Sequence, residues 1–263
     1  MTQNTPPQNE KRRVLLELCY HGADFSGWQI QPDRPSIQGA LMKAFEQLCP
    51  NQPRVIGAGR TDAGVHALQQ IAHVDLVNFE SRKPETWLNA LNSLTPARLW
   101  VKNIKLAQPN FHARFSPHTK TYQYHVDWSS YPNPFESDRR YHLRAIDLNL
   151  KHIDRFMHLI QGTHDFKNYC SIQNDTETTT RTLVSSKCIH QSEEHLIFEY
   201  SGKGFLQHMI RILTGTALHI GLTKVELQTA EKALKQNNMR KALGPTLPAH
   251  GLYLLKTSYS SIY

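Results

Sequence analysis

Apolar and polar positions alternate along the chain with two periods, one typical of strands and one typical of helices. Residues 14–20 place an apolar side chain at every second position, which predicts a strand. Apolar side chains recur at helical spacing over 36–49, with Ser36 as the expected N-cap, and again over 84–94. Further strands are expected over 54–57, 69–77 and 98–106. The pattern therefore predicts the order strand, helix, strand, strand, helix, strand.

A second series of strands and helices follows. Helices are expected over 147–160, where Gly162 would end the helix, from about Gly204 onward, and after a capping box at 223–226. Strands are expected over 120–128, 182–190 and 195–201. Because the two series lack the regular alternation of a parallel sheet, they predict an α+β fold of two domains. The expected domains cover residues 13–110 and 111–263, after a flexible basic tail at 1–12.

Between two of the expected strands, residues 57–67 form a loop punctuated by glycine, with the sequence GAGRTDAGVHA. Its glycines allow sharp turns and a close approach by a bulky ligand. Arg60 and Asp62 bring opposite charges into this loop, and a carboxylate held beside an arginine stays ionised. Such an aspartate can serve as a nucleophile or as a base at neutral pH, so we expect the chemistry here.

Composition adds a strong positive charge to this picture. The 263-residue chain carries 30 Lys and Arg against 22 Asp and Glu, a formal charge of +8, which favours a polyanion such as nucleic acid as its partner. A basic surface without a specific partner explains the same composition equally well. The four cysteines form no C-x-x-C pair, so no metal site and no disulfide framework is expected. No apolar run resembles a signal peptide or a membrane span, which predicts a cytoplasmic protein without membrane contact.

The loop at 59–67 resembles that of the tRNA pseudouridine synthase A family, in which the aspartate of this motif is the nucleophile. An aspartate near glycine alone would be only a turn signal, but further segments that resemble the family occur in order along nearly the whole chain. They are 20–22 with 25–32, 111–116, 162–166, 204–211 with 215–216, and 248–252. Departures from the family pattern occur at His21, Tyr169 and 119–121, and they concern contacts with RNA rather than the chemistry.

The resemblance implies the pseudouridine synthase fold, with two similar mixed α/β domains, antiparallel sheets flanked by helices, and an active-site cleft between the domains. It also implies the reaction, in which uracil is detached from its ribose, turned, and rejoined through carbon 5 without a cofactor. The implied substrate is tRNA, at positions 38 to 40 of the anticodon arm, and the implied assembly is a homodimer. A stacked uridine must first be flipped out, and unstacking costs on the order of a few kcal/mol.

Four residues receive roles from the resemblance. Asp62 is the expected nucleophile, with ribose and base both open as the site of its covalent adduct. Arg60 is expected to help hold the flipped uridine, and an ion pair with Asp62 or a phosphate contact are its simpler alternatives. Tyr122 matches the family tyrosine that contacts the target uracil, although alternating aromatic residues in a strand are more often core. Arg211 is expected in the cleft, paired with the aspartate, although its place opposite an apolar helical stripe indicates a solvated side chain.

Other functions fit parts of the pattern. A non-catalytic RNA chaperone would use the same basic surface without needing Asp62, so substitution of that residue distinguishes the two functions. A glycoside hydrolase would need a second positioned acid, which the loop does not supply. A dinucleotide-binding loop is rejected because Asp62 occupies the third glycine position and a strand is expected to follow. The residue that removes the hydrogen from carbon 5 is left unassigned.

Overall fold

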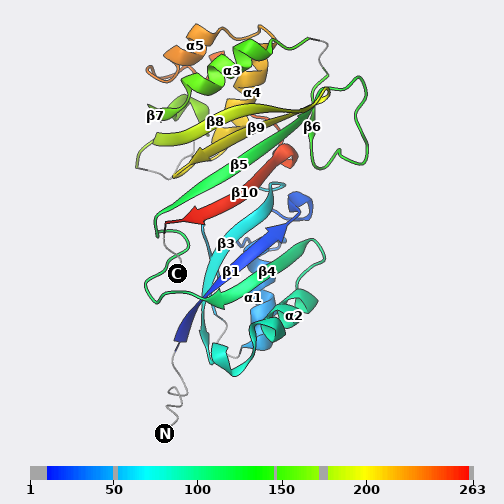
Figure 1. Cartoon of the computed structure of the whole chain (residues 1–263), viewed down its shortest axis with the longest axis vertical. Coiled ribbons are helices and arrows are strands. Elements are labelled where there is room, and N and C mark those ends of the chain that lie inside the picture. The colour runs from blue at the N-terminus through cyan, green and yellow to red at the C-terminus, as the bar shows by residue number, and fades with distance from the viewer. Residues whose placement is uncertain (1–10, 50–52, 145–146, 172–176, 261–263) are drawn as a thin grey trace. The chain divides into compact units, whose positions relative to one another are not determined.

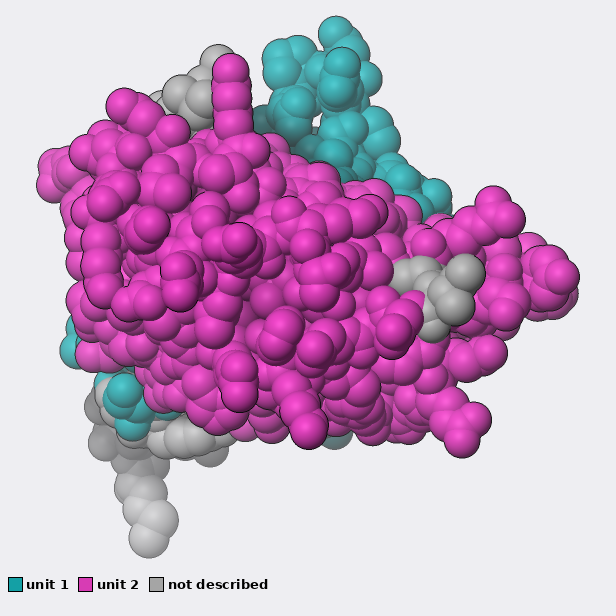
Figure 2. Space-filling model, turned by 90° about the horizontal axis from the view of Figure 1, so that it is seen from above, with its two compact units in different colours: residues 1–118, 257–263 teal, residues 119–256 magenta. Residues whose placement is uncertain are grey.

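The computed structural model describes residues 11–49, 53–144, 147–171 and 177–260 (Figure 1). The chain divides into two compact units, which Figure 2 shows in different colours. Unit 1 comprises Met1–His118 and Thr257–Tyr263, and unit 2 comprises Thr119–Lys256. Each unit contains both strands and helices, as an α+β fold requires.

Unit 1 is an antiparallel sheet with two helices beside it (Figure 1). The strands follow the order β4–β1–β3, and β2 pairs with β3. The predicted order of these elements is confirmed, and the sequence pattern misses two short 3-10 helices. The bounds are β1 Lys11–Tyr20, α1 Ile37–Leu48, β2 Ile56–Gly57, β3 His66–Val77, α2 Pro84–Leu94 and β4 Leu99–Leu106, with 3-10 helices at Gly22–Asp24 and Phe79–Ser81.

Local sequence explains these elements. Leu16 and Leu18 are fully buried on one face of β1, as the alternation predicts. α1 begins where expected, since Oγ of Ser36 accepts a hydrogen bond from the Gly39 N–H at 3.2 Å. The last two residues of the expected tail belong to β1, because Lys11 and Arg12 pair with β3. Residues 1–10 of that tail lie outside the described residues.

The boundary between the units differs from the expected one, because residues 111–118 belong to unit 1. Phe111 and Ala113 are buried in one core cluster with side chains from β1 and β3. Nη1 of Arg13 also donates a hydrogen bond to the Phe111 carbonyl oxygen at 2.6 Å. The sequence could not place this segment, because the alternation of Phe111, Ala113 and Phe115 does not say which of the two cores these side chains join.

Unit 2 contains a larger sheet, in the order β10–β5–β9–β8–β7, with β6 beside β5. β9 runs antiparallel to β5 and β8, whereas β5 and β6 are parallel over two residues, an exception to the predicted antiparallel sheet. Three helices lie together beside this sheet (Figure 1), and α3 packs against β8, α4 and α5. The strands are β5 His118–Asp127, β6 Tyr141–His142, β7 Gly162–Asp165, β8 Thr180–Ser192, β9 His195–Gly202 and β10 Leu252–Tyr259; the helices are α3 Leu150–Leu159, α4 Met209–Gly221 and α5 Leu227–Lys232, with 3-10 helices at Lys167–Tyr169, Arg240–Ala242 and Ala249–Gly251.

Two predicted helix starts in unit 2 are wrong. α4 begins at Met209 rather than near Gly204, because His208 has a φ of 61°, a left-handed conformation that a helix interior excludes. The expected capping box does not cap α5, which begins only at Leu227. Thr223, the first residue of that box, has a φ of 56°, whereas an N-cap residue needs an extended backbone.

Candidate active site

The glycine-punctuated loop joins β2 to β3 in unit 1, between strands as the sequence predicts. β3 holds its first residues, because the Ala58 N–H donates to the Ile71 carbonyl oxygen at 2.7 Å. The side-chain amide of Gln70, which is fully buried, donates to the Gly59 carbonyl oxygen at 3.0 Å. The backbone that leads into the candidate nucleophile is therefore bonded to the core strand of its own unit.

The segment between β1 and α1 holds the middle of the same loop. The Trp28 N–H donates to the Thr61 carbonyl oxygen at 3.1 Å, and the Tyr20 hydroxyl lies 3.0 Å from Oγ1 of Thr61. Nδ1 of His66 accepts a hydrogen bond from the Gly22 N–H at 3.0 Å. Burial raises the pKa of Tyr20 to about 12, so its hydroxyl stays protonated at neutral pH. The loop is thereby fixed from both sides.

Two glycines of this supporting segment are required by its close approach to the loop. Gly27 has a φ of 93°, and a Cβ there would lie 2.7 Å from the Thr61 carbonyl oxygen. A Cβ at Gly22 would lie 2.1 Å from the Val65 carbonyl oxygen. Both distances are far inside van der Waals contact, so a larger residue needs the loop to move. Sequence reasoning misses both glycines because the atoms that they approach lie far along the chain; the one signal is that both segments resemble the same family.

Asp62 and Arg60 lie in this fixed loop. Asp62 is half-buried, and its carbonyl oxygen accepts a hydrogen bond from the Val65 N–H at 3.2 Å, which closes a turn at the candidate nucleophile. Arg60 is exposed, and its side chain makes no hydrogen bond or ion pair among the described residues. The simple ion pair between Arg60 and Asp62 is therefore not part of this structure. The guanidinium is accessible to an anionic ligand.

Tyr122 belongs to unit 2, where it lies in β5 opposite Tyr200 of β9. It is 8% exposed, and its ring meets that of Phe205 edge to face, with 5.1 Å between the centroids. Tyr124 on the same strand is fully buried, and its hydroxyl donates to the Pro248 carbonyl oxygen at 2.7 Å. The interpretation of alternating aromatic residues as core thus holds for both tyrosines, although Tyr122 is slightly less buried than Tyr124.

Arg211 also belongs to unit 2, in the first turn of α4. Its Nε donates to the Leu247 carbonyl oxygen at 2.6 Å, and the Leu247 N–H donates to the Arg211 carbonyl oxygen at 3.4 Å. The expected apolar stripe with Met209 and Leu213 is buried, and the neighbouring Ile212 is buried as well. Because nearly the whole helix lies in the core, Arg211 is half-buried and tethered rather than solvated as the pattern alone indicates.

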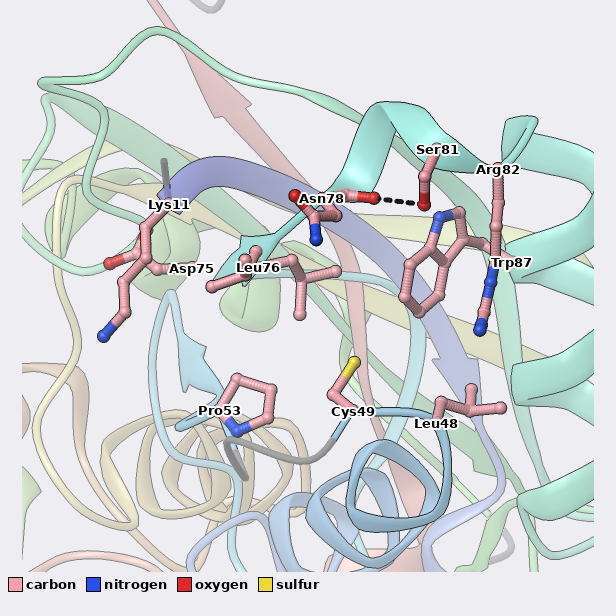
Figure 3. Close-up of a pocket in the computed structure, with 11 residues that line it drawn as sticks. Lys11, Leu48, Cys49, Pro53, Asp75, Leu76, Asn78, Ser81, Arg82 and Trp87 are labelled. Atoms are coloured by element: carbon pink, nitrogen blue, oxygen red, sulfur yellow. Dashed lines mark hydrogen bonds between the residues drawn. The ribbon is translucent and has the colours of Figure 1, made fainter. Parts of the chain in front are cut away.

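Unit 1 also contains a hollow of about 310 Å³ (Figure 3). It touches the C-terminal end of β3 at Asp75, whereas the glycine-punctuated loop enters β3 at His66. A strand rises about 3.3 Å per residue, so roughly 30 Å separates the two places. Figure 3 shows Arg82 alongside the Trp87 ring, with its guanidinium carbon 5.0 Å from the ring centroid. The hollow is thus no part of the loop site; its lining is Lys11, Leu48, Cys49, Pro53, Asp75, Leu76, Val77, Asn78, Ser81, Arg82 and Trp87.

The described part of the chain offers no cluster of three His, Cys, Asp or Glu side chains that could hold a metal ion. All four cysteines are described, and each carries a free thiol. Within the same ranges, no helix is both long enough and apolar enough to cross a membrane.

Comparison with known proteins identifies the family. Residues 19–116 and 157–260 match the sequence profile of a family described as tRNA pseudouridine synthase. The chain is 36% identical over 251 residues to the tRNA pseudouridine synthase A of Geobacillus sp. (strain WCH70), covering 95% of this chain and 99% of the relative. It is 37% identical over 242 residues to that of Halalkalibacterium halodurans, covering 92% of this chain and 90% of the relative. The resemblance seen in the motifs is confirmed, and the chain belongs to the tRNA pseudouridine synthase family.

Proposed function

We propose that this chain isomerises uridine to pseudouridine at positions 38, 39 and 40 of the tRNA anticodon stem-loop, with Asp62 as the nucleophile. As a member of the tRNA pseudouridine synthase family, it is an isomerase that forms pseudouridine in tRNA. The choice of positions and the roles of single residues go beyond that membership. The positions come from the resemblance to the family, and the observation that supports the roles of Asp62 and Arg60 is the fixed loop, with Asp62 at its turn and the accessible Arg60 two residues before it.

The reaction needs one bond broken and one formed at the same ribose carbon. The bond between N1 of uracil and C1′ breaks, and a bond between C5 and C1′ forms. C5 gives up its hydrogen as a proton, and N1 gains a proton. The Asp62 carboxylate can add either to C1′ or to the base, and on both routes it leaves again unchanged. Both routes need a carboxylate held in place, and the hydrogen bonds accepted by the Gly59 and Thr61 carbonyl oxygens support this by fixing the backbone that leads into Asp62.

Arg60 is proposed to hold the flipped uridine or the phosphate beside it. Its guanidinium is planar and permanently charged, with donors arranged to match a phosphate. Because its side chain has no partner within the described residues, binding RNA breaks no existing contact of this arginine. Its position two residues before Asp62 brings the bound nucleotide to the nucleophile.

Tyr122 and Arg211 are the other two residues for which we propose roles. Tyr122 is to contact the target uracil, and Arg211 is to pair with Asp62; both roles come from the family motif. Contacts within unit 2 support these roles, because each one fixes the orientation of a side chain. The ring of Tyr122 packs against that of Phe205, and Nε of Arg211 donates a hydrogen bond to the Leu247 carbonyl oxygen. A homodimer and a cytoplasmic location are part of the same proposal. The homodimer comes from the resemblance to the family, and the cytoplasmic location comes from the pattern of the sequence.

Release of tritium from tRNA labelled at uridine C5 tests the reaction and its nucleophile together. We expect the wild-type protein to release tritium and the modified positions to map to 38, 39 and 40. Asp62→Ala and Asp62→Asn should bind tRNA but release no measurable tritium. The matched control is Asp154→Asn on the exposed surface of α3, which should leave the rate unchanged.

Each alternative gives a different result. Undiminished release by Asp62→Asn would assign the nucleophile to another residue. Binding of tRNA without release by the wild-type protein would favour the non-catalytic chaperone. Release that maps outside the anticodon stem-loop would refute the proposed positions and leave the reaction intact.

A further inference from the structure

A turn in unit 1 presents an exposed aromatic ring that the proposed chemistry does not use. Phe115 is 73% exposed, and its ring stacks on that of His112, with 4.4 Å between the centroids and 27° between the planes. Hydrophobic stabilisation grows with the apolar area removed from water, so a ring left mostly in solvent gains little from folding. Burial therefore does not explain why this ring is held in a defined orientation.

The turn is closed by its own hydrogen bonds. Nδ1 of His112 accepts hydrogen bonds from the N–H groups of Arg114 at 3.1 Å and Phe115 at 3.2 Å. The His112 N–H donates to Oγ of Ser116 at 2.9 Å, and the Ser116 N–H donates to the His112 carbonyl oxygen at 2.9 Å. His112 is thus both the support of the Phe115 ring and the acceptor that shapes the backbone beneath it.

The turn is also anchored to the core of unit 1. Ala113 is fully buried, and its N–H donates to Nδ1 of His73 in β3 at 3.0 Å. The rings of His73 and His112 meet edge to face with 4.6 Å between their centroids. Burial lowers the pKa of His73 to about 4 and also lowers that of His112, so both rings are neutral at pH 7. Phe115 is therefore backed by an uncharged aromatic ring.

A positive charge lies next to the ring. Arg114 is exposed, and its guanidinium carbon is 5.6 Å from the centroid of Phe115. An exposed aromatic ring beside an arginine is the arrangement with which proteins bind unpaired nucleotides, the ring stacking on the base and the arginine meeting the phosphate. A second copy of the same basic chain, with its charge of +8, is a poorer match for this surface than RNA.

We propose that Phe115, backed by His112 and flanked by Arg114, is a stacking platform for an unpaired base of the tRNA substrate. The identity of that RNA rests on the proposed function. The platform binds substrate in addition to the glycine-punctuated loop and takes no part in the bond changes. Because every base has a stacking face, the platform selects a base that is unpaired and accessible, whatever its sequence.

Filter binding of a tRNA transcript to the wild-type protein and four variants tests the ring. Phe115→Ala should weaken the affinity about 5- to 150-fold, the range found when a stacking aromatic is removed. Phe115→Leu keeps an apolar side chain without a ring and should lose nearly as much, whereas Phe115→Trp should stay within about twofold of wild type. The matched control is Phe135→Ala in unit 2, where Phe135 is 84% exposed and has no ring contact among the described residues. That control should bind tRNA like the wild-type protein.

Salt dependence tests the arginine separately. Arg114→Ala should reduce the slope of log affinity against log salt concentration by about 1, because one phosphate contact is lost. The Phe115 variants should leave that slope unchanged, because stacking releases no counterions. Urea denaturation should give the same midpoint for all variants, since the changed side chains are exposed.

Three results would overturn the platform. They are wild-type affinity of Phe115→Ala, restoration of affinity by Phe115→Leu, and equal losses in the Phe115 and Phe135 variants. A change of molar mass in Phe115→Ala by light scattering, with tRNA affinity unchanged, would assign the surface to contact between copies instead. The same preparations are assayed for tritium release. If the wild-type protein neither binds tRNA nor releases tritium, the proposed function is contradicted. If the wild-type protein releases tritium and Phe115→Ala binds tRNA as tightly as wild type, only the platform is contradicted.

Discussion

Gly27 allows a direct test of how the catalytic loop is held, because one added methyl group there would meet backbone atoms. Its φ of 93° costs a residue with a Cβ about 1–3 kcal/mol. The added Cβ would also lie 2.7 Å from the Thr61 carbonyl oxygen, and such overpacking costs a further 1–3 kcal/mol or so. We expect Gly27→Ala to lower the free energy of unfolding by about 2–6 kcal/mol and to displace the loop that carries Asp62.

Gly162 is the matched control for this substitution. It has the same φ of 93°, but an added Cβ would meet only Nε2 of His164, at 3.8 Å. Gly162→Ala should therefore show the conformational cost alone, about 1–3 kcal/mol by urea denaturation, and keep the rate of pseudouridine formation. Gly27→Ala should lose about tenfold or more in single-turnover rate, at a temperature where both variants are folded, because small misplacements of reacting groups are costly. Equal losses of stability and rate in the two variants would refute the reasoning.

Two further predictions concern the stability of unit 1. Burial lowers the pKa of His73 to about 4 in the folded protein, whereas the pKa is about 6.5 in the unfolded chain. Between these two pH values the unfolded chain binds a proton at His73 that the folded protein does not bind. The free energy of unfolding should therefore fall as pH drops from about 6.5 to about 4. His73→Asn keeps an acceptor for the Ala113 N–H without titrating, and it should flatten this part of the curve in urea denaturation; an unchanged slope would contradict the assignment. Ser36→Ala removes the N-cap of α1 and should lower the free energy of unfolding by about 1 kcal/mol. The control Ser93→Ala, at an exposed position of α2, should lower it by about 0.5 kcal/mol or less. Similar values for the two variants would show that the cap contributes nothing.

Elements that carry their own signals are predicted well from the sequence. The expected helix at 84–94 has the bounds of α2, because proline begins it and its apolar residues keep a helical period. Elements whose limits depend on other segments are not. The N–H groups of Lys224 and Val225 both donate to the His219 carbonyl oxygen, at 2.8 and 3.2 Å. These two residues of the expected capping box therefore cap the C-terminal end of α4 instead of beginning α5. β10 is missed because its eight residues become a strand through partners far along the chain.

The candidate site likewise has a part that the local sequence predicts and a part that depends on distant segments. The sequence locates Asp62 and Arg60 in a loop between two strands, because glycine spacing and charge are local features, and the structure confirms that location. The atoms that hold the site are not local. Trp28 and Gly27 meet the loop from before α1, and Leu247 binds Arg211 from beyond α5. The roles of the four site residues stay predictions, for which the tritium assay and the substitutions above are the tests.

Strand β10 ties the completion of unit 1 to the prior synthesis of unit 2. Residues 257–259 of β10 belong to unit 1, whereas 252–256 belong to unit 2. The ring of Tyr259 packs on Phe111 with 5.0 Å between centroids, and its hydroxyl donates to the Ala113 carbonyl oxygen. A ribosome releases the N-terminal residues first, so the whole of unit 2 is synthesised while this part of the unit 1 core is still uncovered. The nascent unit 1 is therefore an incomplete domain until residues 257–259 have been made, and a chain stalled within unit 2 exposes an apolar surface to chaperones and proteases.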